Sequence, residues 1–148
     1  FWCEYLTGKQ YSADYKFVNC SKTGGWWEGI SCWVGMNKVE DLSKFITWIR
    51  SDYIPPLPHQ LDFKSLGDVK HINVEFKGDK VFEVHLRETP DPQYNTLIPV
   101  FKSDMELYGN ALDDETIKVL AGGRYQYIKD FDDADGHLLD PRLGFLVK

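Results

Sequence analysis

The stretch HINVEFKGDKVFEVHLR, residues 71–87, decides the fold expected of this sequence, because it predicts a β-hairpin with two chemically different faces. Side chains alternate between the two faces of a strand. One face of the hairpin therefore carries the apolar residues Ile72, Val74, Phe76, Phe82, Val84 and Leu86. The other face carries His71, Asn73, Glu75, Glu83, His85 and Arg87. The turn lies at Gly78, since glycine accepts a positive φ.

The hydrophobic pattern also predicts how the two strands pair, because a slip of one residue would carry an apolar set to the wrong face. A three-residue turn over 78–80 pairs Lys77 with Val81 and sets the polar residues of the two strands opposite one another. The resulting polar pairs are Glu75 with Glu83, Asn73 with His85, and His71 with Arg87. Two carboxylates that face each other directly repel and destabilise a sheet.

Three interpretations of the facing glutamates follow from their chemistry. In the first, the hairpin is an ordinary amphipathic one and the pair is well solvated on its polar face. In the second, the two carboxylates share a proton. In the third, a divalent cation lies between them, because hard cations bind carboxylate oxygens. The residues alone leave all three open.

Composition indicates one globular domain and excludes several classes of protein. The 148 residues suffice to bury a core, and a content of 43% hydrophobic and 15% aromatic residues argues against disorder. The net charge of -6, without any run of Lys or Arg, gives no expectation of nucleic acid binding. No stretch approaches the ~18 apolar residues of a membrane helix, so no membrane partner is expected. Reduced thiols in the cytoplasm, rather than a disulfide framework or a zinc site, are expected for Cys3, Cys20 and Cys32.

The rest of the chain predicts an α+β fold, an antiparallel sheet with flanking helices. Residues 10–20 and 26–34 alternate loosely and predict two antiparallel strands, with the turn signal at Gly24 and Gly25. Apolar residues at helical spacing predict the clearest helix. The two expected helices and one further strand cover residues 37–50, 113–123 and 124–131, in that order.

At the hairpin the sequence resembles the ATP-grasp superfamily of ligases. Those enzymes carry an acidic residue on one strand and, after a hairpin, the pattern Glu-x-Asn-x-Arg. Here NVEF supplies Glu75, while FEVHLR supplies Glu83, then His85 where Asn is usual, then Arg87. The segment EYLTGKQYSADY, residues 4–15, is similar to the hinge segment with which the family binds adenine.

The resemblance implies an ATP-dependent ligase that activates a carboxylate as an acyl phosphate for attack by an amine or another nucleophile. Glu75 and Glu83 would bind the Mg²⁺ ions that hold the ATP phosphates, and Arg87 would act on the transferring phosphate. His85 and Asn73 would complete the metal site. Because imidazole suits softer metals, Mn²⁺ is an alternative to Mg²⁺. The adenine would lie against the hinge residues Glu4, Tyr5 and Leu6.

The same resemblance predicts how the chain is organised. Residues 1–100 would form the C-terminal subdomain of an ATP-grasp unit, and residues 101–148 an extension packed on the same domain. The family's phosphate-gripping lysines and glycine-rich loop have no counterpart in the sequence, so the chain would be a fragment with little activity. Its partners would be ATP, a small carboxylate, and the missing N-terminal half or a second copy. The alternative is a non-catalytic α+β binding or interaction domain with a solvated hairpin.

Overall fold

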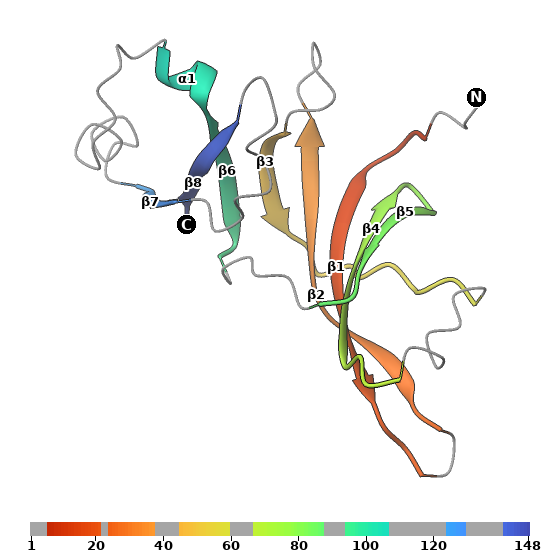
Figure 1. The fold of residues 1–148 in the computed structure, drawn as a ribbon. Coiled ribbons are helices and arrows are strands. Elements are labelled where there is room, and N and C mark those ends of the chain that lie inside the picture. Colours follow the sequence, from red (N-terminus) through yellow and green to blue (C-terminus); the bar gives the residue numbers. More distant parts are fainter. Residues whose placement is uncertain are drawn as a thin grey trace. The chain divides into compact units, whose positions relative to one another are not determined.

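The computed structural model describes residues 6–21, 24–37, 45–59, 67–87, 94–106, 124–129 and 141–148. Its strands are β1 (Gln10–Val18), β2 (Trp26–Asn37), β3 (Phe45–Arg50), β4 (His71–Lys77), β5 (Lys80–His85), β6 (Thr96–Phe101), β7 (Gln126–Lys129) and β8 (Arg142–Val147). The helix α1 spans Lys102–Glu106 (Figure 1). The chain divides into two compact units. The first takes Phe1–Met36 and Arg50–Asp91, and the second takes Asn37–Ile49 and Pro92–Lys148.

The prediction of an α+β fold with flanking helices is wrong for the described part of the chain, which is almost entirely antiparallel β-structure. The helix found there, α1, has five residues, and none of the helices in these ranges is long and apolar enough to cross a membrane. Within the helix predicted over 37–50, Phe45–Arg50 forms β3. This segment is rich in β-branched and aromatic side chains, which favour a strand. Over so short a segment, its apolar residues fit the period of a helix and the period of a strand equally. The helix predicted over 113–123 lies outside the described residues.

The first unit contains the neighbouring strands β5, β4, β1 and β2, in that order across the sheet. Both predicted hairpins are confirmed, because β1 pairs antiparallel with β2 and β4 pairs antiparallel with β5. β1 also pairs antiparallel with β4, from Gln10 opposite Lys77 to Lys16 opposite His71. This long-range ladder joins the two hairpins and sets β1 between β2 and β4 (Figure 1).

One face of this sheet forms the core of the first unit. Its buried side chains are Ala13, Tyr15, Cys32, Ile72, Val74 and Phe76. The proline-rich segment that follows β3 covers part of this face, since Ile54 and Leu57 pack against the core. The hydroxyl of Tyr15 donates a hydrogen bond to the carbonyl of Pro55. The segment that the prolines keep out of any regular element is thus part of the core.

Two of the predicted cross-strand pairs in the β4–β5 hairpin are confirmed. Glu75 faces Glu83, and Asn73 faces His85. β5 ends at His85, so Arg87 lies beyond the strand, and the ladder does not include the pair predicted between His71 and Arg87. The polar face of the hairpin therefore brings two carboxylates, an imidazole and an amide together.

A β-bulge corrects the prediction near the turn. Phe76 pairs with Val81, the residue that the sequence pattern sets opposite Lys77. Val81 packs against the core, whereas Phe82 is 43% exposed. The turn shrinks to residues 78–79. Val81 and Phe82 are adjacent and both apolar, so the hydrophobic pattern of the sequence does not determine which of the two packs in the core.

The second unit contains β3, β6, β8 and β7, in that order. β7 confirms part of the strand predicted over 124–131, whereas β6 and β8 are not predicted from the sequence. β6 contains Pro99, which lacks the N–H of a central strand. Pro99 lies beyond the two β3–β6 pairs, which involve Thr96 and Leu97. The buried side chains of this unit are Leu97, Phe101, Phe145 and Val147.

Candidate functional site

The face of the first sheet that lies opposite the core carries a row of polar side chains. Residues paired directly across two antiparallel strands project from the same face. The register pairs Asp14 with both Ser31 and Asn73, and it pairs Ser12 with Glu75. It continues from β4 to β5 through the two polar pairs of the hairpin. The row, from β2 to β5, therefore consists of Ser31, Ser12, Asp14, Asn73, Glu75, Glu83 and His85.

The middle of this row is a buried hydrogen-bond network. The side-chain nitrogen of Asn73 lies 3.0 Å from Ser12 Oγ, 3.1 Å from Asp14 Oδ1 and 3.4 Å from the carbonyl oxygen of Ala13. The hydroxyl of Ser31 donates to Asp14 Oδ2 at 2.9 Å. Ser12, Asp14 and Asn73 are all buried, and buried polar groups require partners of this kind. The network therefore holds the Asn73 side chain in one orientation.

That orientation directs the amide oxygen of Asn73 away from β1. The Asp14 carboxylate and the Ala13 carbonyl only accept hydrogen bonds, so the atom that faces them is the amide nitrogen. The amide oxygen therefore does not face these acceptors, and on the other side of β4 the residue paired with Asn73 is His85. Asn73 is 3% exposed, and among the described residues its side-chain oxygen accepts no hydrogen bond. Among the described residues, this acceptor is thus left without a donor next to the polar end of the hairpin.

Glu75, Glu83 and His85 form a cluster that has the dimensions of a metal site. Each offers one ligand atom, and these three atoms all lie within 4.8 Å of one another. The Nε2 atom of His85 is 3.6 Å from Glu83 Oε1, and the two side chains are 32% and 52% exposed. Metal–oxygen distances of about 2.0–2.6 Å allow two ligands of one ion to stand up to about 5 Å apart. Small rotations of these side chains suffice to bring all three onto one cation.

Gln10 orients the most protected carboxylate of this cluster. Its side-chain nitrogen donates to Glu75 Oε2 at 3.2 Å, and its side-chain oxygen accepts from Lys77 Nζ at 3.5 Å. The bond to Lys77 is at the limit of hydrogen-bond length. Hydrogen bonds to a metal-ligating side chain fix its direction and raise the affinity of the site for the metal.

The other residues that the resemblance assigns to the site lie beyond the ends of strands or outside the described ranges. Arg87 is exposed and follows the end of β5. Leu6 is half-buried and precedes β1. Glu4 and Tyr5 are outside the described residues, so the adenine contacts predicted for them stay predictions. The structure brings together Glu75, Glu83, His85 and Asn73, which are the predicted metal ligands.

The sequence misses the supporting residues of the cluster. Ser12 and Asp14 recur at the period of a strand, and this alternation is the signal that could have placed them on one face. Their burial depends on the β1–β4 ladder, in which Asp14 and Asn73 are 59 positions apart in the chain. No local pattern predicts which strand becomes the neighbour of which.

The chain matches no family model, no curated protein and no solved structure. The resemblance to the ATP-grasp superfamily therefore depends on the motifs quoted above and stays a prediction. The geometry of the cluster is independent of it, because it consists of distances between described residues.

Proposed function

We propose that the β4–β5 hairpin binds a divalent cation through Glu75, Glu83, His85 and Asn73. The observation that carries the proposal is the convergence of three ligand atoms within 4.8 Å, next to a buried asparagine whose amide oxygen accepts no hydrogen bond from the described residues. The ligand set holds two carboxylates, one imidazole and one amide oxygen. Imidazole suits transition metals better than Mg²⁺, so Mn²⁺ is the preferred ion of the two.

The electrostatics of the hairpin favour an occupied site. Glu75 and Glu83 face each other directly, and like charges in this position destabilise a sheet. A bound cation converts this repulsion into attraction. Glu75 is half-buried, so its charge is screened less by water than that of an exposed carboxylate. The hydrogen bonds that hold Asn73 in place reduce the side-chain entropy lost on binding.

Calorimetric titration with Mn²⁺ and Mg²⁺ tests the proposal. The wild-type chain should bind one Mn²⁺ in a saturable manner and more tightly than Mg²⁺, and the Glu75→Gln/Glu83→Gln variant should lose this binding. Glu28→Gln is the matched control, because Glu28 is an exposed glutamate of β2 outside the cluster. Heats that are equal in all three proteins would place the cation elsewhere. The absence of binding to the wild-type chain would favour a solvated pair or a shared proton.

The ATP-dependent ligase implied by the resemblance is a second proposal, and it depends on the same cation. It is supported by the order of Glu75, Glu83 and Arg87 along one hairpin, which follows the family's pattern. In this proposal the cation holds the ATP phosphates, Arg87 neutralises the transferring phosphate, and a small carboxylate is the acceptor.

The two proposals separate in a titration of ATP into the Mn²⁺-loaded chain. Arg87→Ala should weaken ATP binding by about tenfold or more, in line with the loss of a charge-assisted hydrogen bond. The same variant should keep the Mn²⁺ affinity of the wild-type chain. If the Mn²⁺-loaded chain binds no ATP, the ligase proposal fails and the cation site stands. A binding or interaction module is then the remaining function.

A further inference from the structure

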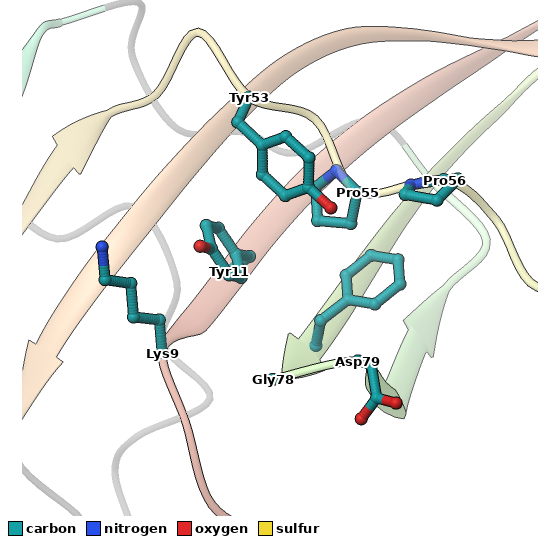
Figure 2. Close-up of a pocket in the computed structure, with 8 residues that line it drawn as sticks. Lys9, Tyr11, Tyr53, Pro55, Pro56, Gly78 and Asp79 are labelled. Carbon is teal, nitrogen blue, oxygen red and sulfur yellow. The ribbon is translucent and has the colours of Figure 1, made fainter.

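A groove of about 400 Å³ opens on the core side of the first unit, away from the polar row (Figure 2). Its lining comes from the residue before β1, from β1, β4, the β4–β5 turn and the proline-rich segment after β3. Aromatic rings and prolines make up most of it, and two charged side chains lie on opposite sides (Figure 2). The apolar lining residues are Tyr11, Tyr53, Pro55, Pro56 and Phe76, and the charged ones are Lys9 and Asp79.

Close backbone packing builds one wall of the groove. The N–H of Gly78 donates to the carbonyl of Lys9 at 2.8 Å. Gly8 and Gly78 have φ values of 102° and 63°, which disfavour side chains. A Cβ atom on Gly8 would lie 2.9 Å from the Cα of Gly78, and one on Gly78 would lie 2.8 Å from the carbonyl oxygen of Thr7. The two glycines thus allow the segment before β1 to pack against the hairpin turn, and this part of the groove is preformed.

The polar groups of the groove are not paired with one another or with other described residues. Within the described part of the chain, Lys9 and Asp79 form no ion pair, and the hydroxyls of Tyr11 and Tyr53 make no hydrogen bond. The two tyrosine rings contact each other edge to face, with centroids 5.7 Å apart. Tyr53 is 57% exposed, which is high for an aromatic ring that makes such a contact. The groove therefore offers a cation, an anion and two phenol groups around an apolar floor.

The chain itself shows which kind of segment this face can hold. Pro55, which lines the groove, lies against the core face, and its carbonyl accepts a hydrogen bond from the hydroxyl of Tyr15. Tyr11 and Tyr15 both belong to this face. A proline-rich segment in the polyproline II conformation has no internal hydrogen bonds, so its carbonyls stay available to such donors. Tyr11 and Tyr53 line the groove beside Pro55 and Pro56 (Figure 2), and within the described part of the chain their hydroxyls make no hydrogen bond.

We propose that the groove binds a short, extended, proline-rich peptide of another protein. Grooves lined by aromatic side chains bind such peptides because the polyproline II helix is preformed and loses little entropy on binding. The rings of Tyr11 and Tyr53 contact the prolines, and their hydroxyls donate to the peptide carbonyls. Lys9 pairs with an acidic residue at one end of the peptide, and Asp79 pairs with a basic residue at the other. This inference goes beyond the cation site and does not depend on it.

Fluorescence anisotropy with a labelled peptide, Glu-Pro-Pro-Leu-Pro-Pro-Arg, tests the proposal. The wild-type chain should bind it in a saturable manner, and replacement of its prolines by alanine should weaken binding by about tenfold or more, since the preformed conformation is lost. Tyr53→Ala and Lys9→Glu should each weaken binding, and Tyr11→Phe should do so through the lost hydroxyl alone. These side chains lie at the rim of the groove or keep their ring, so the circular dichroism of the three variants should match that of the wild-type chain.

Phe82→Ala is the matched control, because Phe82 is an exposed aromatic residue outside the groove. It should leave peptide binding unchanged. The proposal is overturned if the proline and alanine peptides bind equally, if Tyr53→Ala binds like the wild-type chain, or if no saturable binding is seen. Displacement of the peptide by ATP would also overturn it, because the groove would then be a nucleotide site.

Discussion

The two faces of the first sheet are both buried near their centre, but by opposite means. On the core face, Ile72, Val74 and Phe76 are excluded from water, and burial of apolar surface contributes about 25 cal/mol per Å². On the polar face, Asp14 and Asn73 are buried almost as fully, and hydrogen bonds compensate their lost hydration. Such bonds contribute only about 0.5–1.5 kcal/mol each in net terms. The core face supplies stability, whereas the polar face supplies a fixed arrangement of donors and acceptors.

This difference explains why a candidate site lies on one face and the core on the other. A network such as that of Ser31, Asp14 and Asn73 holds side chains in one geometry at little net gain in stability. A geometry of that kind is useful next to a ligand. The metal cluster adjoins this network directly, since Asn73 belongs to the network and faces His85.

The largest effect is expected on the core face, from Phe76→Ala. Phe76 is nearly fully buried, so removal of its ring should lower the free energy of unfolding by about 3–5 kcal/mol. Urea denaturation followed by circular dichroism measures this loss. Phe82→Ala, at the exposed bulge position, should change stability by less than about 0.5 kcal/mol. Similar losses in both variants would mean that Phe82, and not Val81, is the partner of Phe76 in the core.

A smaller loss is expected on the polar face, from Asp14→Ala. The substitution leaves the hydroxyl of Ser31 and the amide nitrogen of Asn73 short of an acceptor, which should cost about 1–3 kcal/mol in unfolding free energy. It should also weaken Mn²⁺ binding, because Asn73 loses its fixed orientation. Asp79→Ala is the control, since Asp79 is exposed and forms no ion pair among the described residues. Equal stability of the two variants would contradict the role given to the network.

The core face should also lose stability in alkaline solution. Burial, with a further contribution from the charge of Asp14, raises the pKa of the Cys32 thiol from 9.0 to about 12. The folded state therefore holds this proton more tightly than the unfolded state. The resulting stabilisation is complete below pH 9 and declines as the pH rises toward 12.

The alkaline effect can be measured through the urea stability of Cys32→Ala at several pH values above neutrality. Its free energy of unfolding should fall less steeply with pH than that of the wild-type chain. Burial also raises the pKa of Tyr15, so some pH dependence should persist in the variant. Parallel curves for the variant and the wild-type chain would argue against a buried thiol at Cys32.

The smallest effect is expected from Glu83→Gln without metal. Removal of one charge from the facing pair should raise the free energy of unfolding by up to about 1 kcal/mol, because Glu83 is half exposed and the repulsion is screened. At 100 times the dissociation constant, Mn²⁺ should stabilise the wild-type chain by about 2.7 kcal/mol and the variant much less. Thermal unfolding with and without Mn²⁺ shows both changes. An equal effect of Mn²⁺ on both proteins would separate Glu83 from the site.

The polar hairpin could be predicted from the sequence because the residues that determine its pairing are close together in the chain. Glu75 and Glu83 lie on either side of one short turn, and alternation alone places them opposite each other. The bulge could not be predicted, because neighbouring apolar residues compete for one core position. The burial of Asp14 could not be predicted either, since it depends on a pairing between distant strands.

Part of the helix predicted over 37–50 is a strand, Phe45–Arg50, for a different reason. Apolar residues in a short segment fit a helix and a strand almost equally, and in Phe45–Arg50 the aromatic and β-branched side chains favour the strand. β6 is not predicted from the sequence because it contains Pro99, and a proline normally argues against a central strand. It is tolerated there because Pro99 lies past the two β3–β6 pairs.

The cation site is tested most directly by nuclear magnetic resonance of the isotope-labelled chain with a small, substoichiometric amount of Mn²⁺. The paramagnetic ion broadens the signals of nearby nuclei. We predict that the side-chain amide of Asn73 and the imidazole of His85 broaden first, and that both stay sharp in Glu75→Gln/Glu83→Gln. Broadening centred on the acidic residues 130–140, or signals of Asn73 and His85 that remain sharp in the wild-type chain, would contradict the cation site.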